Sequence, residues 1–258
     1  MTNIHVLIPS YNCGPWIERC LRSVAEQEHK PAQVLVIDDA STDEDYSSKA
    51  RFWCGGFRYR YWRNDENMKC PYNLRLGIDL LAGEFSSFPM EGIGDEDVIF
   101  LLDGDDFLPH SKVFTRFAEV YSDPEVWLTY GNYQPHPHNT GQALARAYPP
   151  QVIRDRSFRT AGACFNHPLT FRKFLWDEVT DADMQTRNGK WFTGGYDMVI
   201  MAPMLEMCGE RHYRFLDEHL YTYNAVNPIS DSSVNVPLVE ESREMMRRPK
   251  KGLLIREP

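Results

Sequence analysis

In the stretch Phe100-Leu101-Leu102-Asp103-Gly104-Asp105-Asp106, an apolar run ends and three carboxylates follow within four positions. A continuous apolar run is typical of a strand buried on both faces of a parallel sheet, and ligands of such sheets bind beyond the carboxyl ends of the strands. Crowded carboxylates repel one another unless a cation lies among them, and Mg²⁺ and Mn²⁺ prefer carboxylate and phosphate oxygens. The motif therefore predicts a metal-assisted phosphate site, with a solvated acidic turn that caps the next helix as the alternative.

The residues before this stretch predict a βαβ unit. We expect strands at Ile4–Pro9 and Gln33–Asp38, joined by a helix from Pro15 to about Gln27. A strand near 57–62 and a helix near 72–81 continue the alternation. The fold class is thus α/β, with a doubly wound parallel sheet whose polar strand ends meet at one edge.

The second half is less regular. We expect a helix over 111–121, a strand over 126–130 and a helix over 197–208 that Pro203 kinks. The loop 134–148 is expected to be mobile and to close over a bound donor. We predict a single domain over 1–238, whose nucleotide-binding half is 1–109 and whose acceptor half is 110–238, followed by a charged tail, 239–258, that wraps the surface or is partly disordered.

Composition excludes several classes of protein. The 258 residues include 28 Lys and Arg against 37 Asp and Glu, and the net charge of −9 disfavours nucleic acid as a partner. Apolar runs are too short for a membrane span or a signal peptide. Six scattered cysteines without a C-x-x-C pair favour neither zinc nor disulfides, so we expect a cytoplasmic protein.

Three ordered motifs resemble those of the family 2 glycosyltransferases of GT-A fold. They read P-S-Y-N at 9–12, V-I-D-D-A-S-T-D at 36–43 and L-L-D-G-D-D-F-L-P at 101–109, and the resemblance extends from about residue 4 to 230. It implies a Rossmann-like sheet and transfer of a sugar from a nucleotide-sugar donor, usually a UDP-sugar, with inversion at the anomeric carbon. The acceptor would be a hydroxyl, in first place that of a glycan, and the cofactor Mn²⁺ or Mg²⁺.

The resemblance also implies roles at the donor site. Pro9 and Tyr11 would line the nucleobase pocket, and Asp39 would accept a hydrogen bond from the uracil ring. Asp103 would lie near the ribose and the metal. The metal ligands would be Asp105, with or without Asp106.

An inverting transfer needs a general base for the acceptor hydroxyl. The family places a carboxylate at the start of a late helix, where this chain has Gly194-Gly195-Tyr196-Asp197. The resemblance makes Asp197 the candidate base, and a helix cap is the alternative role. His167 falls where related enzymes place residues near the donor or acceptor sugar, and a structural histidine is the alternative.

Two departures from the family pattern affect the donor side. Arg75 in Y-N-L-R-L-G-I at 72–78 is offset by one place from an arginine that family members hold near the donor. The late metal-binding histidine is replaced in Y-T-Y-N-A-V-N-P at 221–228, which leaves Asn227 or His219 as a weak additional ligand.

Other functions stay open at this point. The fold could serve as a nucleotide-sugar-binding module without turnover, or the acceptor could be a hydroxylated, modified DNA base, which the net charge opposes. A nucleotidyltransferase would use a similar site, but the late Asp197 speaks against it. A Rossmann oxidoreductase is disfavoured because no G-x-G-x-x-G follows the first strand.

Overall fold

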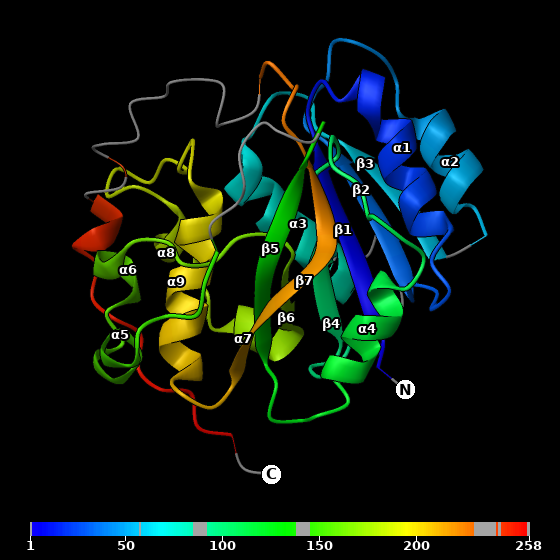
Figure 1. The fold of residues 1–258 in the computed structure, drawn as a ribbon. Helices are drawn as coiled ribbons and strands as arrows, with labels where there is room; N and C mark the ends of the chain where they lie inside the picture. Colours follow the sequence, from blue (N-terminus) through cyan, green and yellow to red (C-terminus); the bar gives the residue numbers. More distant parts are fainter. Residues whose placement is uncertain are drawn as a thin grey trace.

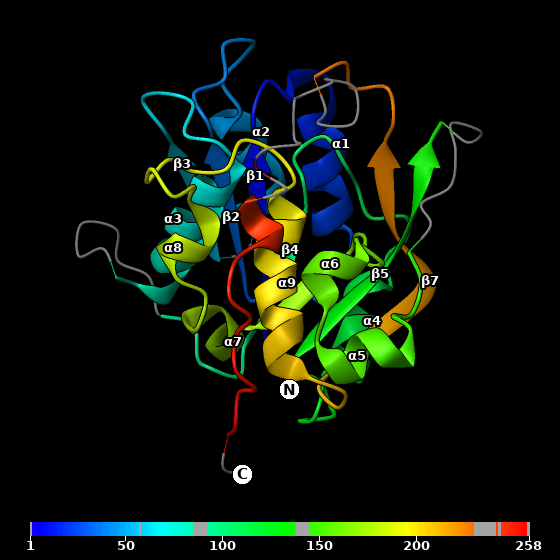
Figure 2. The same cartoon turned by 90° about the vertical axis from the view of Figure 1, so that its left-hand side faces the viewer.

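The computed structural model of the protein describes residues 2–56, 58–84, 92–137, 145–229, 241 and 244–256. Within these residues one sheet of seven strands has helices on both faces (Figures 1 and 2). The strands are β1 (Ile4–Ser10), β2 (Gln33–Asp38), β3 (Arg58–Arg63), β4 (Val98–Leu101), β5 (Leu128–His136), β6 (Leu169–Arg172) and β7 (Tyr213–Asn224). The helices are α1 (Gly14–Ala25), α2 (Ser47–Cys54), α3 (Cys70–Ala82), α4 (Val113–Val120), α5 (Pro150–Asp155), α6 (Phe158–Ala161), α7 (Lys173–Asp177), α8 (Asp181–Met184) and α9 (Tyr196–Cys208).

The strand order β3-β2-β1-β4-β6-β5-β7 confirms the α/β class. β1 pairs in parallel with β2 on one side and with β4 on the other, so the chain changes direction of growth between β1 and β4. Such a switch point opens a crevice at the carboxyl ends of its two strands. The sheet is mostly parallel, as the predicted α/β class requires, and β6 is the strand that runs antiparallel to both β4 and β5.

Alternating side chains of the central strands form a core on each face of the sheet. Val6 and Ile8 of β1 pack toward α1 and α4, whereas Leu7 packs toward α3 and α9. Burial on both faces explains why these strands are apolar throughout rather than alternating with polar residues. Each large side chain buried in this way stabilises the fold by about 1.5–3 kcal/mol.

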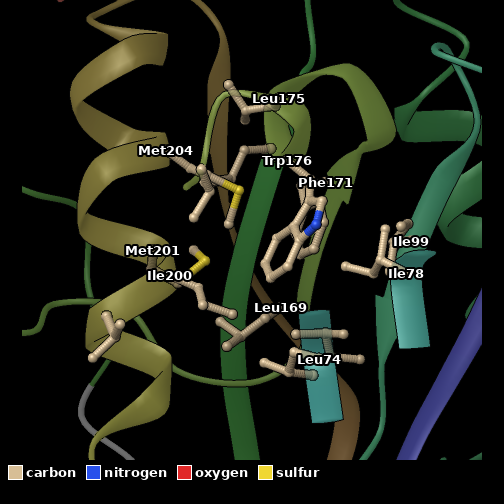
Figure 3. Close-up of a cluster of buried hydrophobic side chains, with 14 of the residues drawn as sticks. Leu74, Ile78, Ile99, Leu169, Phe171, Leu175, Trp176, Ile200, Met201 and Met204 are labelled. Atoms are coloured by element: carbon tan, nitrogen blue, oxygen red, sulfur yellow. The ribbon is translucent and has the colours of Figure 1, made fainter. Parts of the chain in front are cut away.

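The core on the α3 side joins the two halves of the chain around Trp176 (Figure 3). Leu74 and Ile78 of α3 approach it from the first half, and Ile200 and Met204 of α9 from the second. The predicted helix over 197–208 is confirmed as α9, which contains Pro203. The packing holds the central part of α9 against the strands of the first half of the chain.

The loop predicted over 134–148 is partly strand. Residues 134–136 continue β5 beside β7, and residues 138–144 lie outside the described part of the chain. The expected closure of this loop therefore stays a prediction. Among the described residues, no helix combines the length and apolar character that crossing a bilayer requires.

The C-terminal residues 244–256 run back along α9 (Figure 2). The Leu254 amide donates to the Met207 carbonyl at 3.1 Å, and the Met245 side chain is buried in the core that Trp176 occupies. The described C-terminal segment is therefore packed on the same helix that begins at Tyr196.

Candidate active site

The ends of β1 and β4 form the floor of the candidate site. The amide of Gly104 donates to the carbonyl of Pro9 at 3.0 Å, which ties the acidic turn to the end of β1. A β-carbon on Gly104 would lie 2.9 Å from the β-carbon of Ser10 and closer still to its hydroxyl. The turn can approach β1 this closely because residue 104 is glycine.

The end of β2 forms the adjacent wall. Asp38 is fully buried and accepts hydrogen bonds from Tyr61 at 2.7 Å and from the Ser41 amide at 2.8 Å, so it belongs to the framework. Asp39 accepts from the Asn64 side chain at 2.8 Å and from the amides of residues 68 and 69 at 2.8 and 3.0 Å. These bonds fix the Asp39 carboxylate beside β1.

Loop contacts hold the P-S-Y-N segment against the wall formed by β2. The Asn12 amide donates to the Ser41 hydroxyl at 2.9 Å, and the Thr42 amide donates to the Asn12 side chain at 2.8 Å. Tyr11 lies on the same loop with its side chain 40% exposed. An exposed ring on a fixed loop is available to stack on a planar ligand.

The three acidic residues of the turn have different environments. Both oxygens of Asp103 accept from the Tyr196 hydroxyl, at 2.9 and 2.8 Å. Asp105 accepts from the Asn227 side-chain amide at 2.7 Å. Burial and the neighbouring charge of Asp103 raise the pKa of Asp105 to about 6. The site therefore concentrates negative charge that a cation would relieve.

Asp106 lies behind the site rather than in it. Its side chain is fully buried and accepts hydrogen bonds from the Tyr221 hydroxyl and from the Asn224 amide, both at 2.7 Å. Burial, with the charge of Asp105, raises the pKa of this carboxyl well above its usual range. The geometry argues against the expected ligation of a metal by Asp106 and for a role in fixing β7 to the turn.

His167 occupies the space between the turn and α9. Its Nε2 lies 3.7 Å from an oxygen of Asp103, and its ring stacks on Tyr221 with centroids 4.7 Å apart. Burial lowers the pKa of His167 to about 4, against the opposing charges of Asp197 and Asp105. The imidazole is therefore neutral near pH 7, and its buried Nδ1 has no hydrogen-bond partner within the described chain.

Asp197 stands in the first turn of α9, two residues after the left-handed Gly195. Its Oδ1 accepts from the Met198 amide at 2.8 Å, and its charge acts on His167. A carboxylate is favourable at a helix N-terminus, so the position is consistent with the predicted cap as well as with a base. The structure brings Asp103, Asp105, His167 and Asp197 to one edge of the sheet.

Comparison with known proteins identifies the family. Residues 5–179, more than half of the chain, match the model of "Glycosyl transferase family 2". The chain belongs to this family.

Curated relatives agree with the assignment. One of them, the glycosyltransferase GlyG of Streptococcus pneumoniae, is 22% identical over 138 residues, which are 54% of this chain and 41% of that protein. A Campylobacter jejuni β-1,3-glucosyltransferase named for a diphosphoundecaprenol-linked glycan is 28% identical over 34% of this chain and 29% of its own. An uncharacterized Mycobacterium tuberculosis protein is 54% identical over 49% of this chain and 35% of its own. The chain spans less than half the length of each of these relatives.

Solved structures show that the fold is shared. S. aureus TarS in complex with UDP-GlcNAc superposes with a TM-score of 0.65 at 15% identity, covering 91% of this chain and 62% of TarS. A Pyrobaculum calidifontis mannosyltransferase in complex with GDP-Man and Mn²⁺ superposes with a TM-score of 0.55 at 20% identity, covering 89% of this chain and 58% of that one. The expected GT-A architecture is thereby confirmed.

Two of the residues expected in this family 2 glycosyltransferase's donor site make other contacts in the structure. Arg75 donates to Asp181 at 2.9 Å and to the Val179 carbonyl, and its guanidinium lies over the Trp176 ring. These contacts bind α3 to the α7–α8 region, and the expected role of Arg75 at the donor stays a prediction. His219 shares a hydrogen bond with Thr222 at 3.1 Å, and it is Asn227 that lies beside Asp105.

Three tyrosine and asparagine side chains of the site escaped sequence analysis. Tyr196 and Tyr221 hold Asp103 and Asp106, and Asn64 holds Asp39. Tyr196 directly precedes the predicted base, and this adjacency is the one sequence signal that pointed to any of them. Tyr221 and Asn64 come from a strand and a loop whose positions only the fold reveals.

The described residues contain no cluster of three or more His, Cys, Asp or Glu side chains suited to a metal ion. The donor set at the turn is nevertheless chemically suitable, because Asp103 and Asp105 present hard oxygens at one crowded, partly buried position. A pair of carboxylates matches the way Mg²⁺ is usually held, by one or two carboxylates and substrate phosphates. The residues present therefore fit a divalent cation that arrives with a nucleotide.

Proposed function

We propose that this family 2 glycosyltransferase transfers a sugar from a nucleotide-sugar, in first place a UDP-sugar, to a hydroxyl of a glycan acceptor, with inversion at the anomeric carbon. The observation that supports this proposal most directly is the meeting of Asp103, Asp105 and Asp197 at the switch-point edge. The UDP-GlcNAc and GDP-Man complexes of the structural neighbours support a nucleotide-sugar donor.

The nucleotide would bind between the ends of β1 and β2. Pro9 and the exposed ring of Tyr11 would line the nucleobase, and the fixed carboxylate of Asp39 would accept the hydrogen bond from a uracil N–H. A carboxylate has about four lone-pair sites, so three internal hydrogen bonds leave room for one more. A base without a ring N–H at this position would bind less tightly.

Asp103 and Asp105 would hold Mn²⁺ or Mg²⁺ together with the diphosphate, and Asn227 would orient the Asp105 carboxylate. When bound, the cation neutralises the charge that develops on the departing diphosphate. Asp106 keeps the turn in place through Tyr221 and Asn224. His167, neutral and without charge of its own, would face the donor sugar as a hydrogen-bonding and packing group.

The transfer would be a single displacement. The acceptor oxygen attacks the anomeric carbon from the face opposite the diphosphate, and its proton passes to the Asp197 carboxylate. The bond between the anomeric carbon and the diphosphate oxygen breaks, and the electron pair leaves with the diphosphate. The first turn of α9 holds Asp197 partly exposed, as access to an acceptor requires.

Calorimetric titration with UDP, GDP and a panel of nucleotide-sugars, each with and without Mn²⁺, tests the donor half of the proposal. We expect metal-dependent binding of one nucleotide class in the wild type and its loss in Asp105→Ala. Asp177→Asn, which removes an exposed carboxylate paired with Lys173 on α7, is the matched control and should bind as the wild type does. Absence of binding to every donor would reject the proposal.

Asp197→Asn tests the base. Nucleotide binding should persist, and the transfer rate should fall by about 10²–10⁴-fold, the usual contribution of a general base. Loss of nucleotide binding to the same extent as transfer would contradict the base assignment. Nucleotide binding by the wild type without transfer to any glycan acceptor would instead indicate a binding module.

A further inference from the structure

We infer that the C-terminal residues Glu241 and 244–248 form a clamp that positions Tyr196 and Asp197, with Glu241 and Glu244 as its positioning residues. The inference rests on the proposed function insofar as it assigns the base to Asp197. It concerns a part of the chain that lies beyond the three motifs and beyond residues 5–179 of the family match.

The clamp grips the loop that leads into α9. The Glu241 carboxylate accepts from the Thr193 amide at 3.0 Å and from the Thr193 hydroxyl at 3.0 and 3.2 Å. The Glu244 carboxylate accepts from the Arg187 amide at 2.5 Å. Both acidic side chains thus accept from backbone N–H groups of the same loop, which fixes the path of its main chain.

The cationic side chain of Arg248 adds further contacts between the clamp and the loop. Arg248 donates to the Gln185 carbonyl, forms an ion pair with Glu244 at 3.3 Å, and lies over the Phe192 ring at 5.2 Å. Met245 is 5% exposed and packs in the core beneath it. The clamp is therefore anchored in the protein interior and contacts the loop at its start, middle and end.

The site needs such an anchor because of the glycines that separate the loop from the base. Gly194 and Gly195 follow Thr193 directly, and Gly195 has a φ of 61° with open space where a side chain would be. Glycine restricts the backbone less than any other residue, so the sequence alone does not set the direction in which Tyr196 and Asp197 leave the loop. The Glu241–Thr193 contact fixes the chain three residues before Tyr196, whose hydroxyl holds Asp103.

The far end of the same segment is attached independently. The Lys251 amide donates to Glu206 at 2.9 Å, and its ammonium pairs with Asp183 at 2.8 Å. Substitutions at Glu241 and Glu244 can therefore release the loop without detaching the C-terminal residues from α8 and α9. This separation makes a specific test possible.

Limited trypsin digestion measures how firmly the clamp holds the loop. Arg187 and Lys190 are exposed on the loop, so release of the loop should expose these two peptide bonds. In the double variant Glu241→Ala/Glu244→Ala we expect cleavage at 187 and 190 to be faster by about fivefold or more, because cleavage follows local opening. Glu119→Ala, which removes an exposed carboxylate paired with Arg116 on α4, is the matched control and should cleave as the wild type does. Unchanged cleavage in the double variant would overturn the clamp.

Transfer and binding assays on the same variants test positioning. We expect the transfer rate of the double variant to fall by about 10–100-fold, with the Kd for nucleotide and Mn²⁺ within about twofold of the wild type. Glu241→Gln, which keeps one acceptor oxygen, should recover part of the rate. Faster cleavage without a change in transfer would overturn the positioning role.

Thr193→Val distinguishes loss of the Glu241–Thr193 contact from a general folding defect. It removes only the hydroxyl that donates to Glu241, and it should lower the transfer rate less than Glu241→Ala and add nothing when the two are combined. Additive effects would contradict a direct coupling. If the wild type neither bound nucleotide nor transferred sugar, the proposed function would fail, whereas the cleavage rates would still decide whether the clamp exists.

Discussion

The hydroxyl of Tyr196 donates to both carboxylate oxygens of Asp103, at 2.9 and 2.8 Å. Tyr196 is the first residue of α9, and Asp103 follows β4, so this contact joins the two halves of the chain across the site. Burial and the charge of Asp103 raise the pKa of the Tyr196 phenol, which keeps the hydroxyl protonated as a donor. The contact therefore links the acidic turn to the first turn of α9, where Asp197, the proposed base, lies.

Tyr196→Phe should weaken the link between the acidic turn and the first turn of α9. Loss of one hydrogen bond to a carboxylate is expected to lower the free energy of unfolding by about 1.5–3 kcal/mol. Because Asp197 is the next residue, the transfer rate should fall by about tenfold or more, through a small displacement of the base. Urea unfolding and a transfer assay measure the two effects, and a transfer rate equal to that of the wild type would contradict the link.

Gly104→Ala should disturb the acidic turn. The new β-carbon would lie 2.9 Å from the Ser10 β-carbon, so the turn must move away from β1. Overpacking of this kind costs about 1–3 kcal/mol of stability, and metal-dependent nucleotide affinity should fall because Asp103 and Asp105 flank residue 104. Combining it with Ser10→Gly removes the clash and should restore much of the affinity; failure to do so would show that the close approach is not the cause.

Arg159→Met should strongly destabilise the fold. Arg159 and Glu206 are 3% and 0% exposed and form a bidentate pair at 2.8 and 3.0 Å, beside the Lys251 amide. Removing one partner of a buried pair costs about 3–5 kcal/mol, whereas replacing both by apolar residues is often neutral. Urea unfolding of Arg159→Met and of Arg159→Met/Glu206→Leu measures this contrast, and equal loss in both would argue against a charge effect.

Asp79→Asn should change how stability depends on pH. Burial raises the pKa of Asp79 from 3.8 to about 6, although the charge of Arg75 opposes the shift. A raised pKa means that the folded chain binds the proton more tightly, so the stabilisation is complete below about pH 4 and is lost as the pH rises through about 6. The asparagine variant should therefore gain about 1–2 kcal/mol relative to the wild type between pH 5 and pH 8. Unfolding curves of both proteins at pH 5 and pH 8 test this prediction. A difference in the free energy of unfolding between variant and wild type that is the same at both pH values would contradict the raised pKa.

Much of the first half of the fold could be predicted from sequence. β1, β2 and β4 are short apolar runs that end in polar motifs, and the positions of Asp39 and Asp103 at strand ends follow from that pattern. The second half could not be predicted in the same way. β6 is only four residues long, and the polar residues of β7 are held by partners distant in sequence, as Tyr221 is by Asp106. Local patterning contains no signal for such pairings.

The residues of the candidate site differ in the same way in how far the sequence predicts them. The motif residues at the strand ends could be placed from the sequence, whereas the contacts of Arg75 could not, because its partners, Asp181 and Val179, lie more than a hundred positions away. The sequence left open whether Asp106 joins Asp105 as a ligand, because the three carboxylates of the turn look alike in sequence, and only the fold shows that Asp106 is the fully buried one. Tertiary contacts, not residue type, set the environment of each carboxylate.

The reversed direction of β6 also divides the surface of the molecule into two regions for protein engineering. The turn before β6 contains His167 and lies at the edge of the candidate site, beside Asp103, whereas the helix after β6 lies at the opposite edge, with the exposed turn 122–125 that precedes β5. A fluorophore or an affinity sequence inserted at 122–125 should leave the candidate site undisturbed, whereas the same insertion before β6 should displace His167 from it.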